Sequence, residues 1–222
     1  FYKKNINMDV IPSDSNFDKY KVLLLPVMIV HKKEVQDKVR KFVANGGTVV
    51  FTYRTAVKDY YNNLTLGQFN PTYYTDLVGG YVEEVESFQD DQVAKLIGNE
   101  EFEGINGTAT VFRDMLKTTT AKTLFKYEDE FFEDLAAVTL NEYEGGKVYY
   151  IGSGADNTIM DAIANKIINE SNLDAIESEE GVEVVRRSLN NEDYYFVMNH
   201  TSNEKKFRNE TLKAYEAKIV KA

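Results

Sequence analysis

A strand–helix–strand pattern near the beginning of the chain constrains the fold more than any other feature. Residues 20–25 (Tyr-Lys-Val-Leu-Leu-Leu) and 48–53 (Thr-Val-Val-Phe-Thr-Tyr) are short apolar runs, typical of strands covered on both faces. Residues 32–44 lie between them and carry apolar side chains at helical spacing, and the Asn-Gly-Gly sequence at 45–47 predicts the end of that helix. The pattern predicts a right-handed βαβ unit with parallel strands.

Further elements extend this unit into an α/β domain. Residues 156–169 form the clearest helix pattern, with one broad apolar stripe and with Asp156 as the predicted cap. Glu144-Gly145-Gly146 is a strong hairpin signal. Strands are predicted at residues 5–11, 81–86, 121–127, 136–143 and 147–151, with polar strands and loops at 90–113. Together these elements predict a doubly wound, mostly parallel sheet.

The pattern changes near residue 179. Residues 171–180 are polar and acidic, as in a linker. Short strands are then predicted at residues 182–184, 194–197 and 215–220, with no helix between them. We therefore expect two domains, an α/β domain over residues 1–175 and a small all-β module over residues 179–222.

Composition excludes several classes of function. The chain has 26 Lys and Arg against 36 Asp and Glu, so its net charge of −10 disfavours binding to nucleic acid or to an anionic membrane. It contains no cysteine, which excludes disulfides, thiolate metal sites and a Cys nucleophile. No stretch approaches the roughly 20 apolar residues of a membrane helix, and no signal-peptide pattern is present. We expect a cytoplasmic protein without a membrane partner.

No catalytic, metal or cofactor residues are predicted. His31 and His200 are the only histidines and lie far apart in the sequence. Gly152-Ser153-Gly154 precedes a helix, but Asn157 stands where a dinucleotide motif needs its third glycine, and Asp156 would repel an anion. We expect a tight turn there. The acidic runs are expected to be solvated surface and not the carboxyl pair of a glycosidase; they lie at residues 83–84, 90–91, 128–130 and 179–180.

Ordered segments of the chain resemble the non-catalytic part of glycoside hydrolase family 42 β-galactosidases. The resemblance begins with Asn-Ile-Asn-Met-Asp-Val-Ile-Pro at residues 5–12 and covers nearly the whole chain in order. The other segments that carry it are residues 20–26, 42–50, 52–55 with Asp59, 144–152, 181–187, 195–201 and 212–217.

The resemblance implies a three-domain parent enzyme. A (β/α)₈ barrel would carry the two catalytic Glu residues of a retaining β-galactosidase. A flavodoxin-like domain, similar to class I glutamine amidotransferases, would mediate trimerisation, and a small β domain would follow. This sequence resembles only the second and third domains, so we expect it to be no enzyme by itself. Its partners would be further copies of itself in a homotrimer and its own barrel in cis.

A Tyr-rich stretch is the candidate contact surface, because aromatic side chains are favoured at interface cores, although they also pack within a domain. Two other functions stay open. A free-standing α/β domain would bind a small molecule at the carboxyl ends of its strands, near Pro26, Arg54 and Gly152, and a sugar-binding module would use Tyr faces. The candidate interface residues are Tyr53, Arg54, Asp59, Tyr60, Tyr61, Phe69, Tyr73 and Tyr74.

Overall fold

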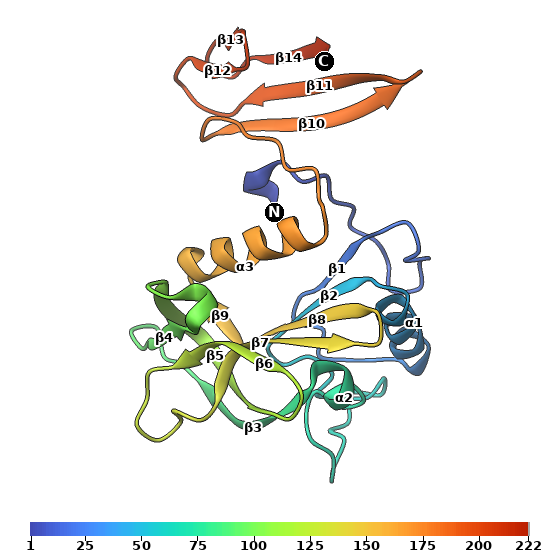
Figure 1. The fold of residues 1–222 in the computed structure, drawn as a ribbon, viewed down its shortest axis with the longest axis vertical. Coiled ribbons are helices and arrows are strands. Elements are labelled where there is room, and N and C mark those ends of the chain that lie inside the picture. The colour runs from blue at the N-terminus through green and yellow to red at the C-terminus, as the bar shows by residue number, and fades with distance from the viewer. Residues whose placement is uncertain (222) are drawn as a thin grey trace. The chain divides into compact units, whose positions relative to one another are not determined.

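The computed structural model describes residues 1–221, which form two compact units (Figure 1). The larger unit is the continuous segment Ser13–Ile167. The smaller unit combines Phe1–Pro12 with the chain from Ile168 onward. The larger unit is therefore inserted, in sequence, between two segments of the smaller one.

The larger unit is built on one mixed sheet whose strands lie in the order β1-β2-β8-β7-β6-β4-β5-β3, with β9 paired to β5. Its strands are β1 (Val22–Leu25), β2 (Thr48–Thr52), β3 (Gly80–Ser87), β4 (Ala94–Gly98), β5 (Asn106–Thr118), β6 (Lys122–Tyr127), β7 (Ala136–Tyr143), β8 (Gly146–Ile151) and β9 (Ser153–Ala155). Its helices are α1 (Lys33–Ala44), α2 (Thr75–Val78) and the short 3₁₀ helix η2 (Glu100–Phe102), and α3 (Asn157–Glu170) follows β9.

The predicted βαβ unit is confirmed. Strands β1 and β2 pair in parallel, and β2 pairs in parallel with β8. Helix α1 connects β1 to β2 and packs on β2 and β8 through its buried face, where Val39 and Val43 are fully buried. The helix forms because its apolar residues recur every three or four positions, and it ends where Gly46 adopts a left-handed φ of 93°.

Parallel pairing is confined to β1, β2 and β8, and every other pairing in this sheet is antiparallel. The reason is the short connections between later strands. Tyr143 pairs with Gly146, so β7 and β8 are joined by a two-residue turn in which Glu144 has a φ of 50°. Such a turn allows only antiparallel neighbours. The predicted hairpin is confirmed, and the predicted parallel, doubly wound character holds only around α1.

The smaller unit contains the predicted all-β module. Strands β10 (Val182–Leu189), β11 (Glu192–Asn199) and β14 (Ala217–Lys221) form an antiparallel sheet, and β12 (Lys205–Phe207) and β13 (Glu210–Leu212) form a separate hairpin. This hairpin was not predicted, because each of its strands has three residues and carries charged side chains. Its Phe207 and Leu212 close the core of the module over Val184, Tyr195 and Val197.

The predicted strand at residues 5–11 is wrong. The chain forms the 3₁₀ helix η1 (Tyr2–Lys4) and then an irregular segment. The buried side chain of Asn5 takes the place of a strand ladder: its amide donates to the Ile176 carbonyl and to the Ser178 hydroxyl, each at 2.8 Å. Its oxygen accepts the N–H of Val184 at 2.8 Å. This side chain therefore pairs the Val184 N–H on the outer edge of β10 and two groups of the preceding segment, at residues 176 and 178.

Replacing Asn5 with Ala is expected to lower the free energy of unfolding of the smaller unit by about 1–3 kcal/mol. The buried N–H of Val184 and the partly buried Ile176 carbonyl would lose this partner, while the Ser178 hydroxyl would keep its bond to the Val182 carbonyl. Asn7→Ala is the matched control, since Asn7 is exposed and makes one bond, to the Arg186 carbonyl at 3.2 Å. Denaturant titration followed by tyrosine fluorescence would measure both. Equal effects of the two substitutions would contradict the role assigned to Asn5.

Candidate functional site

A buried carboxylate fixes the turn that follows β2. One oxygen of Asp114, on β5, accepts the backbone N–H of Arg54 at 2.7 Å and the hydroxyl of Tyr150 at 2.6 Å. Asp114 is 2% exposed. Burial raises the pKa of its carboxyl, while the hydrogen bonds from Tyr150 and Arg54 act in the opposite direction. The carboxylate joins β5, β8 and the turn at residues 53–56 into one rigid assembly.

The backbone of this turn adopts an unfavourable conformation. Arg54 and Ala56 adopt φ values of 60° and 53°, in the left-handed region that side chains other than glycine disfavour. The hydroxyl of Thr55 donates to the Thr52 carbonyl at 2.6 Å, and the Tyr53 N–H donates to the Ile151 carbonyl at 2.8 Å. These bonds hold Tyr53 and Arg54 in fixed positions at the carboxyl end of β2.

Tyr53 and Arg54 both pack on one ring. The rings of Tyr53 and Phe112 stack with centroids 5.9 Å apart at 22°, and the Arg54 guanidinium carbon lies 4.9 Å from the Phe112 centroid. Phe112 projects here because β5 is irregular beside it: Val111 has a φ of 68°, and the register with β9 shifts between Thr110 and Arg113. We call Tyr53, Arg54 and Phe112 the Arg54 platform.

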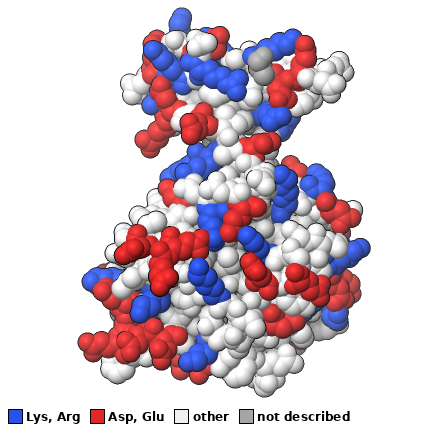
Figure 2. All heavy atoms as spheres, viewed as in Figure 1, with Lys and Arg blue, Asp and Glu red and all other residues white. Residues whose placement is uncertain are grey.

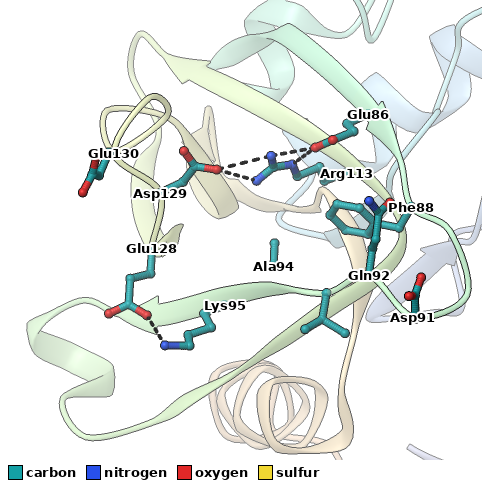
Figure 3. A pocket seen from close by; sticks show the side chains of 11 residues that line it. Glu86, Phe88, Asp91, Gln92, Ala94, Lys95, Arg113, Glu128, Asp129 and Glu130 are labelled. Carbon is teal, nitrogen blue, oxygen red and sulfur yellow. Dashed lines mark hydrogen bonds and ion pairs between the residues drawn. The ribbon is translucent and has the colours of Figure 1, made fainter.

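An open pocket of about 740 Å³ lies beside Arg113, the residue that follows Phe112 on β5 (Figure 3). Two of the acidic runs converge here. The acidic runs at residues 90–91 and 128–130 were predicted to be solvated surface, and they form much of the rim of this pocket. The lining residues are Glu86, Phe88, Asp91, Gln92, Val93, Ala94, Lys95, Arg113, Glu128, Asp129 and Glu130.

Arg113 is already paired within this pocket. Figure 3 shows its guanidinium between Glu86, at 2.6 Å, and Asp129, at 3.3 Å. Three aromatic rings, those of Phe88, Tyr127 and Phe132, lie 5.1–5.5 Å from the guanidinium carbon. Both carboxylates are therefore engaged by one cation. The group ties β5 to β3 and to the loop after β6, and it supplies no free nucleophile or base.

The predicted tight turn at Gly152-Ser153-Gly154 is wrong, because Ser153 and Gly154 belong to strand β9, which pairs with β5. A Cβ on Gly152 would lie 2.5 Å from the Asp114 carbonyl oxygen, so β5 packs closely against this glycine. Asp156 caps α3, since it accepts the N–H of Ile159 at 3.1 Å, and its other oxygen accepts the N–H of Thr108 at 2.7 Å. A carboxylate therefore already occupies the start of this helix, as the sequence indicated.

The predicted interface residues all lie between β2 and α2, in residues 53–74, beside the loop that follows β1. The N–H of His31 donates to the Lys58 carbonyl, and the N–H of Ala56 donates to the Met28 carbonyl, so the loop after β1 runs beside residues 56–58. Tyr60, Tyr61, Phe69 and Tyr73 are exposed, and Tyr53, Arg54 and Asp59 are half-buried. Leu64 and Leu66 are exposed between them, and the aromatic-based prediction missed them.

Two of the predicted residues have internal roles. Tyr74 is 0% exposed, so its inclusion in an interface was wrong. It packs on Phe51 of β2, and its hydroxyl lies 2.9 Å from Nδ1 of buried His31. Asp59 accepts the N–H groups of Tyr61 and Asn63, each at 2.9 Å, and these bonds lower the pKa of its carboxyl and order the loop.

Among residues 1–221, no group of three or more His, Asp or Glu side chains is placed to hold a metal ion. Over the same residues, no helix has the length and apolar character needed to cross a bilayer.

Comparison with known proteins places the chain among the accessory domains of glycoside hydrolases. Residues 1–174 match the family described as the β-galactosidase trimerisation domain, and residues 181–222 match the β-galactosidase C-terminal domain. Because the first match covers most of the chain, the chain belongs to the β-galactosidase trimerisation domain family. The resemblance to glycoside hydrolase family 42 is confirmed.

Individual relatives cover the same region. The chain is 31% identical over 207 residues to β-galactosidase GalA of Bacillus licheniformis and 26% identical over 204 residues to β-galactosidase BgaP of Planococcus sp.. Each alignment covers 90% of this chain and 30% of the relative, so the chain spans about 30% of the curated proteins it matches. A crystal structure of β-galactosidase from Bacillus circulans sp. alkalophilus superimposes with a TM-score of 0.88 at 25% identity, covering 100% of this chain and 34% of the other.

Acidification is expected to destabilise the larger unit through His31. Burial lowers the pKa of His31 to about 4, from its ordinary 6.5, so the unfolded state takes up a proton first as the pH falls. Between pH 6.5 and 4 this one group should remove about 3 kcal/mol of stability, and the loss is complete below pH 4.

Denaturant titrations of the wild type and of His31→Gln at pH 7, 5.5 and 4 would measure the effect. The glutamine does not titrate, so the difference in unfolding free energy between the two proteins should shift in favour of the variant as the pH falls. A constant difference across this pH range would contradict the buried, neutral state of His31.

Proposed function

We propose that this chain is an assembly module that joins three copies into a homotrimer. The observation that carries the proposal is the match of residues 1–174 to the β-galactosidase trimerisation domain. The loop between β2 and α2 supports it, because it exposes both aromatic and aliphatic side chains. Monomeric proteins rarely leave large contiguous apolar patches in water. We define the loop surface as Tyr60, Tyr61, Leu64, Leu66 and Phe69.

The loop surface belongs to a larger proposed interface that includes Tyr53, Arg54, Asp59 and Tyr73. A trimer with threefold symmetry uses heterologous contacts, in which one patch meets a different patch of its neighbour. Tyr and Arg are enriched in the residues that dominate interface energies. We propose that the flavodoxin-like part of the fold, β1, α1, β2 and β8, is the scaffold that presents this loop.

The domain boundaries belong to the same proposal. We assign assembly to residues 1–175 and a separate supporting role to the β module at 179–222. The two family matches, which end at residue 174 and begin at residue 181, support a boundary in this interval.

Light scattering on the purified chain is expected to give the mass of three chains. Replacing Tyr61 and Leu66, which are 80% and 86% exposed, with Ser should weaken the trimer because both side chains would lose apolar burial. Phe131→Ser is the matched control, since Phe131 is 89% exposed and lies outside this loop. A wild-type chain that stays monomeric at high concentration would contradict the proposed trimer. An unchanged trimer in the double variant would move the interface elsewhere.

We further propose that the assembly serves hydrolysis of terminal β-galactosides in the cytoplasm. The names of the relatives support this activity, and each relative is about three times as long as the alignment. The reaction would belong to a catalytic barrel in cis, outside these 222 residues. The net charge of −10 argues against nucleic acid as a further partner, and Figure 2 shows clustered acidic side chains on the face that it presents.

A chromogenic galactoside should not be hydrolysed by this chain. One reason is that, of the carboxylates lining the pocket, Glu86 and Asp129 are bound to Arg113 and Glu128 is paired with Lys95. Glycoside hydrolysis needs one carboxyl group to give a proton and another to attack or to activate water. Turnover above the buffer rate, lost in Glu86→Gln and Asp129→Asn, would overturn the assignment of catalysis to another domain.

A further inference from the structure

The turn that carries Arg54 is held in an unfavourable state. Two of its residues, Arg54 and Ala56, have left-handed φ values, and its position depends on the buried carboxylate of Asp114. Each left-handed residue and each buried charge costs stability unless the surrounding structure compensates. Backbone strain of this kind clusters at sites that bind or switch. The surrounding structure therefore holds the Arg54 backbone in an unfavourable conformation, and forming the turn does not by itself require this loss of stability.

The Arg54 guanidinium is oriented but not bound. It lies over Phe112, which also stacks on Tyr53, and it is half-buried. Within residues 1–221 its N–H groups make no hydrogen bond or ion pair. Arg113, one residue beyond Phe112, shows the contrast, because Glu86 and Asp129 occupy its guanidinium. The charge of Arg54 acts to lower the pKa of the Asp114 carboxyl, but no hydrogen bond joins the two side chains, so the guanidinium N–H groups are available to an external group.

The chemistry of that group follows from the donor. A guanidinium is planar and presents parallel N–H groups, the geometry that binds a carboxylate through two hydrogen bonds. Copies of this chain are a ready source, since Asp and Glu outnumber Lys and Arg by 36 to 26. The Arg54 platform also begins the segment that carries the loop surface, so it continues the proposed interface.

We infer that Arg54 receives an Asp or Glu carboxylate from a second copy of this chain and is an energetic centre of the trimer contact. The inference rests on the proposed trimer. In a ring of three copies, each would supply one Arg54 and one carboxylate, because heterologous contacts pair unlike patches. Asp114, Tyr150 and Phe112 act as positioning residues that keep the guanidinium in place before association.

Sedimentation equilibrium of the whole chain would test this inference with Arg54→Met and Arg54→Lys. Both variants should raise the trimer dissociation constant by about tenfold or more, since lysine keeps the charge but loses the flat, two-bond geometry. Arg208→Met is the matched control, because Arg208 is also stacked, 4.1 Å from the Tyr195 centroid, on the smaller unit. It should leave the constant unchanged. Near-ultraviolet circular dichroism would confirm that each variant keeps the native fold.

Salt separates a charge contact from simple loss of packing. Raising the ionic strength from about 0.1 M to about 1 M shortens the screening length from about 10 Å to about 3 Å, so the wild-type trimer should weaken more than the Arg54→Met trimer. A folded Arg54→Met trimer with the wild-type dissociation constant would overturn the inference and leave the trimer intact. A wild-type chain that never trimerises would instead overturn the proposed function, and this inference with it.

Discussion

The architecture of the larger unit depends on the buried carboxylate of Asp114. This side chain lies where the parallel strands β2 and β8 end and the antiparallel strand β5 crosses beside them. A charge buried there is unfavourable unless hydrogen bonds compensate it. The Tyr150 hydroxyl and the Arg54 N–H provide that compensation, and the Tyr127 hydroxyl donates to the Asp114 carbonyl at 3.2 Å. The position of the turn after β2 therefore follows from the electrostatics of the core and not from the composition of the loop.

Sequence patterns predicted the regular elements whose apolar residues repeat locally. Helices α1 and α3 and strands β1, β2, β7 and β8 were found because helical or buried-strand spacing is visible within a few residues. The strand prediction at residues 5–11 was wrong because it also relied on local spacing. The apolar residues alternate as in a strand, but Val10 is fully exposed and Asn5 makes the contacts. A single polar side chain that replaces a strand ladder leaves no periodic signal.

The candidate site shows a similar limit. The Tyr-rich stretch was predicted to be a contact surface, and composition alone could not separate exposed Tyr61 from Tyr74, which lies in the core against Phe51. Distinguishing them requires knowing which residues neighbour β2 in space. The pairing of Arg113 with Glu86 and Asp129 joins residues 16 and 27 positions apart, so it too depends on the folded topology. Family resemblance supplied the functional context that local patterns lacked.

Insertion of the larger unit between two segments of the smaller one gives the chain a double mechanical tether. The backbone passes from one unit to the other at residues 12–13 and again, within helix α3, at residues 167–168. Force applied to either unit is shared between two covalent connections. A single proteolytic nick in one connection would leave the other intact, and the bonds of Asn5 to residues 176, 178 and 184 would still hold the first residues of the chain to the β module. Within the smaller unit, the hydrogen bonds of Asn5 therefore hold the N-terminal segment to the C-terminal β module.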